Sequence, residues 1–216
     1  MAFSKFLNPK NDFAFKAVFG SERNQAILIH FINDLLDLKD DAQVKTVSLI
    51  KTSQDPEIAA KKQSLIDVLC TDQQERQYII EMQLARMKGF EKRAQYYASK
   101  AYSRQLNEGE GYELLNEVIF IAITDFVMFP DKQNYYSKHC LLDNETYTHD
   151  LKGFSFRFLE LPKFNKSIDE LTNRIEKWSY FLKHAQETCE EDLPQIVGSD
   201  SIILKAYEAL NRYSWT

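Results

Sequence analysis

Two carboxylates interrupt neighbouring apolar runs of the chain. Asp67 lies in the run SLIDVLCT and Glu81 lies in the run QYIIEMQL. Charged side chains are seldom buried without a partner or a metal, so both acids are unusual in this setting. The segment 72–76 between the runs is entirely polar, and this pattern predicts a β-hairpin. With residue 74 at the centre of the turn, antiparallel pairing places the two acids nearly opposite each other on one face.

Two carboxylates at such a distance repel each other unless a cation lies between them. Hard oxygen ligands select Mg²⁺, Mn²⁺ or Ca²⁺. Gln83 shares the face of Glu81 because side chains alternate along a strand, whereas Met82 points away and its carbonyl offers a backbone oxygen. Asp67, Glu81, Gln83 and the Met82 carbonyl are sufficient to hold one metal ion and a water. Such a metal lowers the pKa of the water and stabilises the charge of a reacting phosphate.

A structural interpretation of the same acids stays open beside the catalytic one. Asp67 could accept a hydrogen bond at the end of a strand, and Glu81 could pair with Arg93. Asp12 could be the N-cap of the first helix rather than a site residue.

A basic segment follows the predicted hairpin. Six basic residues lie between residues 86 and 104 against the single acid Glu91. Arg93, Tyr97, Lys100 and Arg104 are spaced to share one face of a helix, and basic and aromatic residues on one face suit a phosphate backbone. The alternative is a solvated helix surface. Lys16 is a further candidate for a phosphate contact.

Hydrophobic periodicity predicts the elements that would position these residues. The pattern is that of a single mixed α/β domain in which helices cover a sheet, without an internal repeat or a flexible linker. Helices are expected from residue 11 or 12 to 19, at 22–36, from 89 to about 109, at 168–187 and at 202–213. Strands are expected at 44–50, 64–71, 77–84, 117–126, 135–142 and 154–161, with a loop at 52–62.

Composition excludes several classes of protein. The chain has 216 residues, is 44% hydrophobic and 13% aromatic, and contains only six glycines and five prolines. Collagen-like and disordered chains are therefore excluded. No apolar run is long enough for a membrane-spanning helix, there is no signal-peptide pattern, and the three cysteines lack metal-ligand spacing, so we expect a cytoplasmic protein. The net charge of −5 counts against non-specific nucleic-acid binding over the whole surface but leaves a local patch possible.

Asp67 followed by Glu81-x-Gln83 resembles the signature of the PD-(D/E)xK nuclease superfamily, with Gln in place of the usual Lys. An ordered set of further motifs along residues 8–213 resembles the Rpn family, recombination-promoting nucleases that are also described as transposases. That set consists of Asp12-x-x-Phe15-Lys16-x-x-Phe19-Gly20, IIEMQ at 79–83, Arg93-x-x-Tyr96-Tyr97, Tyr112 before VIFIAITDF, Phe158-Leu159-Glu160-Leu161-Pro162-Lys163-Phe164 and Trp178-x-x-Phe181-Leu182.

The resemblance implies a restriction-endonuclease-like αβββαβ core with extra C-terminal helices. It assigns residues 1–190 to the nuclease-like domain and 191–216 to a helical extension, which is expected to be shorter than in the family. It also implies that Asp67 and Glu81 bind the metal, that Gln83 orients the attacking water, and that Asp12 contributes an acid from the first helix. The implied cofactor is Mg²⁺, with Mn²⁺ as a substitute, and the implied partner is DNA.

Three functions are therefore weighed. The first is a Mg²⁺-dependent DNA endonuclease that hydrolyses phosphodiester bonds and is linked to recombination or mobile elements. The second is a DNA- or partner-binding module that has lost useful catalysis, with Gln83 as the symptom. The third is an interaction protein without enzymatic activity, which would form a homodimer through its aromatic-rich C-terminal half.

Overall fold

The computed structural model describes residues 4–50 and 66–211. The predicted loop at 52–62, the first residues of the predicted strand at 64–71 and the last residues of the predicted helix at 202–213 lie outside these ranges. The chain divides into two compact units, which we call the helical unit (residues 1–47 and 161–216) and the sheet unit (residues 48–160). Each unit is described by itself. The division expected at residue 190 stays a prediction.

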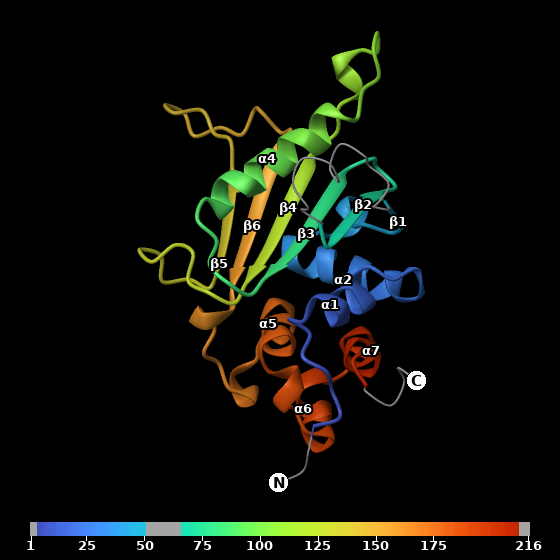
Figure 1. The fold of residues 1–216 in the computed structure, drawn as a ribbon, viewed down its shortest axis with the longest axis vertical. Helices are drawn as coiled ribbons and strands as arrows, with labels where there is room; N and C mark the ends of the chain where they lie inside the picture. Colours follow the sequence, from blue (N-terminus) through green and yellow to red (C-terminus); the bar gives the residue numbers. More distant parts are fainter. Residues whose placement is uncertain (1–3, 51–65, 212–216) are drawn as a thin grey trace. The chain divides into compact units, whose positions relative to one another are not determined.

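The sheet unit is built on a mixed six-stranded sheet with the strand order β1-β2-β3-β4-β6-β5 (Figure 1). β3 pairs antiparallel with β2 and parallel with β4, while β6 pairs parallel with β4 and antiparallel with β5. The α/β class and the expected αβββαβ order are confirmed. The strands are β1 (Val47–Leu49), β2 (Val68–Asp72), β3 (Gln77–Gln83), β4 (Val118–Thr124), β5 (Tyr136–Cys140) and β6 (Phe154–Glu160).

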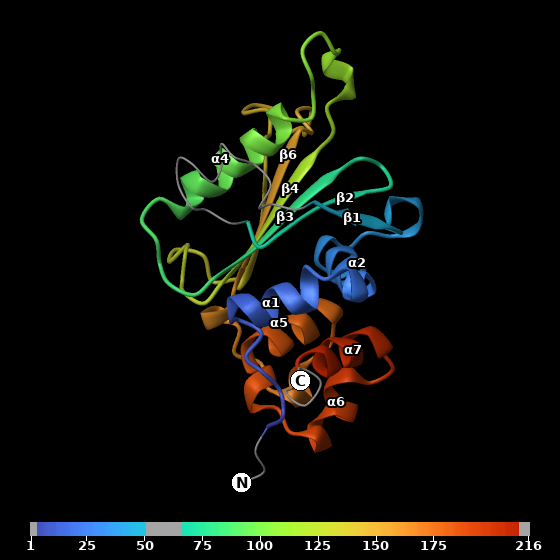
Figure 2. The ribbon, with the colours of Figure 1, turned by 45° about the vertical axis from the view of Figure 1, so that its right-hand side comes forward.

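Helix α4 (Phe90–Ser103) connects β3 to β4 and lies along one face of the sheet, as Figure 2 shows. Its buried residues pack against buried apolar side chains of β3, β4 and β6. Every residue of β4 is buried, which confirms the predicted central strand. Strand residues 79, 81 and 83 of β3 point to the face that α4 covers, because Ile79 belongs to this shared core and side chains alternate along a strand.

The turn between β2 and β3 is fixed by one buried carboxylate. Asp72 accepts hydrogen bonds from the backbone of Gln74 and Arg76, from the Arg76 side chain and from the Tyr78 hydroxyl, at 2.7–3.0 Å. The resulting register pairs Val68 with Ile80. Since the turn is centred on residue 74, the predicted register is confirmed, and one residue further along the pairing Asp67 comes opposite Glu81.

The helical unit has an aromatic core. Phe19 and Phe31 have ring centroids 4.9 Å apart, and Phe31 meets Trp178 at 5.3 Å. The predicted apolar faces of the first two helices are buried here. The two ends of the described chain also meet, because Leu7 N–H donates to the Leu210 carbonyl. The helices are α1 (Asp12–Phe19), α2 (Gln25–Leu36), α5 (Arg174–His184), α6 (Leu193–Val197) and α7 (Ser201–Ala209).

The predicted helix at 168–187 is wrong in length. Only α5 is α-helical, and it is flanked by the short 3-10 helices Ile168–Glu170 and Ala185–Glu187. Ser167 and Glu170 form a capping box, and the Asn173 side chain accepts from Glu176 N at 3.0 Å, so a separate helix starts after Asn173. The remaining 3-10 helices are Glu22–Asn24, Asp40–Ala42, Tyr112–Leu114, Leu161–Lys163 and Glu190–Asp192. None of the helices in the described ranges is long and apolar enough to cross a membrane.

Candidate active site

The hairpin brings Asp67 next to the strand position of Glu81. Asp67 immediately precedes β2, and its Oδ2 accepts a hydrogen bond from Met82 N, the backbone amide directly after Glu81, at 2.8 Å. The Glu81 side chain lies in the middle of β3 and is fully buried. The two carboxylates therefore occupy adjacent positions of the hairpin.

Glu81 pairs with a cation from helix α4. Its Oε2 accepts from Arg93 Nη2 at 2.6 Å, whereas its Oε1 is buried and has no hydrogen-bond partner within residues 4–50 and 66–211. The guanidinium carbon of Arg93 lies 5.2 Å from the ring centroid of Phe90 and 5.7 Å from that of Tyr97. Arg93 Nη1 also donates to Met87 Sδ at 3.3 Å. Two rings and two hydrogen bonds therefore hold the guanidinium against Glu81.

Burial raises the pKa of Glu81 from its ordinary value of 4.5 to about 7. Arg93 acts in the opposite direction by its charge and its hydrogen bond, and the charge of Asp67 adds to the rise. The loss of hydration is the dominant effect, so the carboxyl group titrates close to neutral pH. Perturbed carboxyl groups of this kind concentrate at functional sites.

The donor set fits a hard divalent cation. Glu81 Oε1 is a buried oxygen that lacks a hydrogen-bond partner in the described structure, and a cation beside it would offset the cost of its ionisation. Asp67 supplies a second carboxylate at the neighbouring strand position. Oxygen ligands of this type suit Mg²⁺ or Mn²⁺ rather than soft metals. Gln83 ends β3 on the same face, half-buried and in register with Thr124.

The family model of the PD-(D/E)XK nuclease family transposases matches residues 9–216. The chain belongs to this family. No match was found among the curated proteins or the solved structures. The mixed sheet with flanking helices agrees with the restriction-endonuclease-like fold of PD-(D/E)XK nucleases, which use divalent metals. Membership therefore connects the buried Glu81 of β3 and the half-buried Asp67 before β2 with the nuclease chemistry of the family.

The predicted DNA-binding face of α4 is only partly exposed in this family member. Tyr97 is 7% exposed and belongs to the core between α4 and the sheet, because it follows Ala94 by three residues and shares its side of the helix. Arg93 forms an ion pair with the buried Glu81. Lys100 is half-buried and Arg104 is exposed.

Asp12 and Lys16 belong to the helical unit, so their part in the site stays a prediction. The two side chains form an ion pair with each other at 2.6 Å along α1. The side chain that caps α1 is that of Asn11, which accepts from Phe13 N at 3.0 Å.

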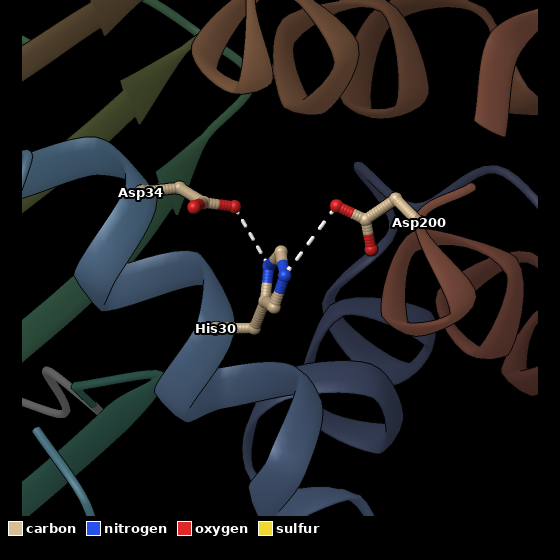
Figure 3. Close-up of side chains that lie close together, drawn as sticks. All are labelled: His30, Asp34 and Asp200. Atoms are coloured by element: carbon tan, nitrogen blue, oxygen red, sulfur yellow. Dashed lines mark ion pairs between the residues drawn. The ribbon is translucent and has the colours of Figure 1, made fainter. Parts of the chain in front are cut away.

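A second cluster of side chains that can bind metals lies in the helical unit (Figure 3). It was not identified from the sequence. His30 of α2 stands between two acids, with Nδ1 2.7 Å from Asp34 Oδ2 and Nε2 3.4 Å from Asp200 Oδ2. One ligand atom from each residue falls within 4.8 Å of the others. The signal in the sequence is the i, i+4 spacing of His30 and Asp34 on one helix face; nothing local points to Asp200.

The donors around this second group favour a structural role. Asp34 Oδ2 also accepts from Trp178 Nε1 at 2.8 Å, and Asp34 Oδ1 accepts from Arg174 Nη1 at 3.1 Å. Asp200 Oδ1 accepts the first backbone N–H groups of α7. A metal would have to displace donors that then lack an acceptor, which is costly in a buried setting. The group therefore links α2, α5 and α7 through hydrogen bonds and charge.

Proposed function

We propose that this chain is a metal-dependent DNA endonuclease that hydrolyses phosphodiester bonds. The observation that carries the proposal is the buried Glu81, whose Oε1 has no hydrogen-bond partner in the described part of the chain, beside Asp67 in a member of a nuclease family. Asp67, Glu81 and the Met82 carbonyl would hold the metal, Mg²⁺ with Mn²⁺ as a substitute. When bound, such a cation lowers the pKa of a water and stabilises charge on the phosphate.

The chain's own residues have distinct tasks in this proposal. The Gln83 amide can donate to and accept from a water, so it can orient the nucleophile, but it supplies neither a base nor a positive charge. Arg93 fixes Glu81 through Oε2 and leaves Oε1 available on the other side of the carboxylate. Lys100 near the end of α4 and Arg104 directly after it are the proposed phosphate contacts.

The transposase description of the family supports a role in recombination or in the movement of DNA elements. The cleavage activity itself is tested first. Supercoiled plasmid is incubated with the full chain and Mg²⁺, Mn²⁺, Ca²⁺ or EDTA. Nicking is expected with Mg²⁺ or Mn²⁺ and is lost in EDTA.

Two variants and one control assign the nicking to this site. Asp67→Asn keeps an acceptor for Met82 N and Glu81→Gln keeps one for Arg93, so both should fold and both should lose nicking by at least ~100-fold. Asp131→Asn removes an exposed acid of the same unit and should nick like the wild type. Full nicking by both site variants, or none by the folded wild type, contradicts the proposal.

A metal-binding measurement gives a readout that does not depend on turnover. Calorimetric titration with Mn²⁺ or Ca²⁺ should show one site in the wild type and in Asp131→Asn. Asp67→Asn should weaken that site by tenfold or more, roughly the effect of losing one charged ligand.

One observation favours a second candidate function, a DNA-binding module without useful catalysis. Gln83 stands where the signature has Lys, and Glu81 already has a cationic partner in Arg93. Tight, salt-dependent plasmid binding by a wild-type protein that never nicks would select this alternative.

A further inference from the structure

A pocket of about 470 Å³ opens beside the candidate site, within the sheet unit. One side is the segment that leads from β3 into α4, and the other side is the segment that follows β4. Ligands of open α/β sheets commonly bind at this place, beyond the carboxyl ends of the parallel strands. The size is in the range of small-molecule sites. The side chains that matter here are Arg86, Met87, Lys88, Glu91, Phe126 and Met128.

We propose that this pocket takes an unpaired nucleotide of the DNA strand on which the site acts. The inference rests on the proposed function and narrows its substrate to DNA with a single-stranded or extruded base. Three features of the pocket carry it, namely its link to Glu81, its rigid wall and its chemistry.

A short chain of contacts links the pocket to the candidate acid. Met87 lines the pocket, and its Sδ accepts from Arg93 Nη1 at 3.3 Å. The other end of the same guanidinium, Nη2, holds Glu81 Oε2 at 2.6 Å. One side chain therefore separates the pocket lining from the acid, so a nucleotide seated here lies next to the phosphate that the site would attack.

The wall of the pocket formed by Phe126 and Met128 is fixed by two fully buried side chains. Thr124 Oγ1 donates to the Phe126 carbonyl at 2.9 Å, and Glu160 Oε2 accepts from Met128 N at 2.7 Å. Thr124 and Glu160 are directly paired neighbours at the ends of β4 and β6. The segment is therefore already ordered in the folded protein. Ligand binding does not have to bear the entropic cost of ordering it.

The lining suits a nucleotide in both of its parts. Phe126 and Met128 give a half-buried apolar surface on which a base can stack. Arg86 and Lys88 are exposed and form no ion pair within residues 4–50 and 66–211, so both are available to a phosphate. They outnumber the one carboxylate of the lining, that of Glu91. A base inside a duplex is paired and stacked on its neighbours, so only an unpaired base can enter such a pocket.

The test measures equilibrium binding in EDTA, where neither metal nor cleavage contributes. A labelled thymidine oligonucleotide is compared by fluorescence anisotropy with an abasic strand of the same length and with a duplex. The wild type should bind the base-bearing strand more tightly than either competitor. Equal affinity for the abasic strand, or tighter binding of the duplex, overturns the inference.

Matched pairs of variants locate the binding. Phe126→Leu should weaken binding of the base-bearing strand by roughly five- to hundredfold, the range for loss of one stacked base, and should leave the abasic strand unaffected. Tyr96→Leu removes an exposed ring of α4 that does not line the pocket and should change nothing.

Arg86→Gln should weaken the binding of the base-bearing and the abasic strand equally. The loss should exceed that in Lys92→Gln, which removes an exposed charge outside the pocket. If Phe126→Leu fails to fold, Met128→Ala takes its place with the same expectation. Wild-type affinity of the pocket variants, or equal losses in the controls, contradicts the inference.

The outcome is separable from that of the nuclease proposal. Binding that follows these variants in a protein that never nicks plasmid would refute the nuclease proposal and keep the nucleotide pocket. Nicking that is insensitive to Phe126→Leu, together with unchanged strand binding, would refute the pocket alone.

Discussion

Replacing Glu81 by Gln should make the protein, in the absence of metal, less sensitive to alkaline pH. The carboxyl group titrates near 4.5 when it is exposed and at about 7 in the fold. Between these two values the folded chain binds a proton that the unfolded chain has lost, so the free energy of unfolding falls as pH rises through this window. One pKa unit corresponds to ~1.4 kcal/mol. The wild type should therefore lose ~2–3 kcal/mol between pH 5 and pH 8 through this one group.

Urea unfolding of both proteins at pH 5 and pH 8, followed by circular dichroism in EDTA, measures this loss. All other titrating groups are common to the two proteins, so the difference between their pH profiles isolates Glu81. The free energy of unfolding of Glu81→Gln minus that of the wild type should therefore be ~2–3 kcal/mol larger at pH 8 than at pH 5.

Added Ca²⁺ should narrow the gap at pH 8, because a cation favours the carboxylate of the wild type. Parallel pH profiles would refute the reasoning that burial dominates. A variant that loses more stability than the wild type at pH 8 would show instead that pairing with Arg93 outweighs the loss of hydration.

Further expectations follow from the two buried charge groups. Arg93→Gln should cost more stability at pH 8 than at pH 5, because at pH 8 Glu81 without its counter-charge must take up a proton, whereas at pH 5 it already holds one in the wild type; equal losses at both pH values in urea unfolding would contradict this. Asp34→Ala leaves the buried Trp178 indole N–H without its acceptor and should cost ~1–3 kcal/mol, whereas Glu191→Ala, at an exposed acid, should change stability by less than ~0.5 kcal/mol. Thermal melts of Glu81→Gln, which lacks one ligand of the candidate metal site, should also show that EDTA leaves the melting temperature unchanged, since the cluster around Asp34 is held by protein donors; a rise with added Zn²⁺ that is absent in a variant also carrying Asp34→Ala would favour a metal site at the cluster instead.

The position of the two candidate acids could be predicted from sequence because it depends on local information. A polar turn between two apolar runs fixes the centre of a hairpin, and the centre fixes which residues face each other. Asp72 reinforces this centre by bonding to the turn that follows it. The placement of Asp67 across from Glu81 follows from the position of the turn centre alone.

The role of Arg93 could not be decided in the same way. Helical periodicity places Arg93 and Tyr97 on one face, but it does not say whether that face meets solvent or a sheet. The small residues Ala94 and Ala98 decide the matter, because they let α4 approach β3 and β4 closely enough to bury Tyr97 and to bring Arg93 to Glu81. The predicted long helix failed for a related reason, since an apolar stripe can continue across the capping residues that separate two helical segments.

The pair of Glu81 and Arg93 also explains how a chain can keep an acid buried without losing its fold. A lone ionised carboxylate in the core would cost several kcal/mol, on the order of the whole stability of a small domain. Arg93 removes part of that cost at one oxygen only, and the remaining cost is what raises the pKa of the group. A cation at the other oxygen would lower the cost further, so metal binding and stability are coupled through the same carboxylate. Because Arg93 also contacts Met87 in the pocket lining, a nucleotide in the pocket would act on the same pair, and metal affinity should then differ between the free and the DNA-bound protein.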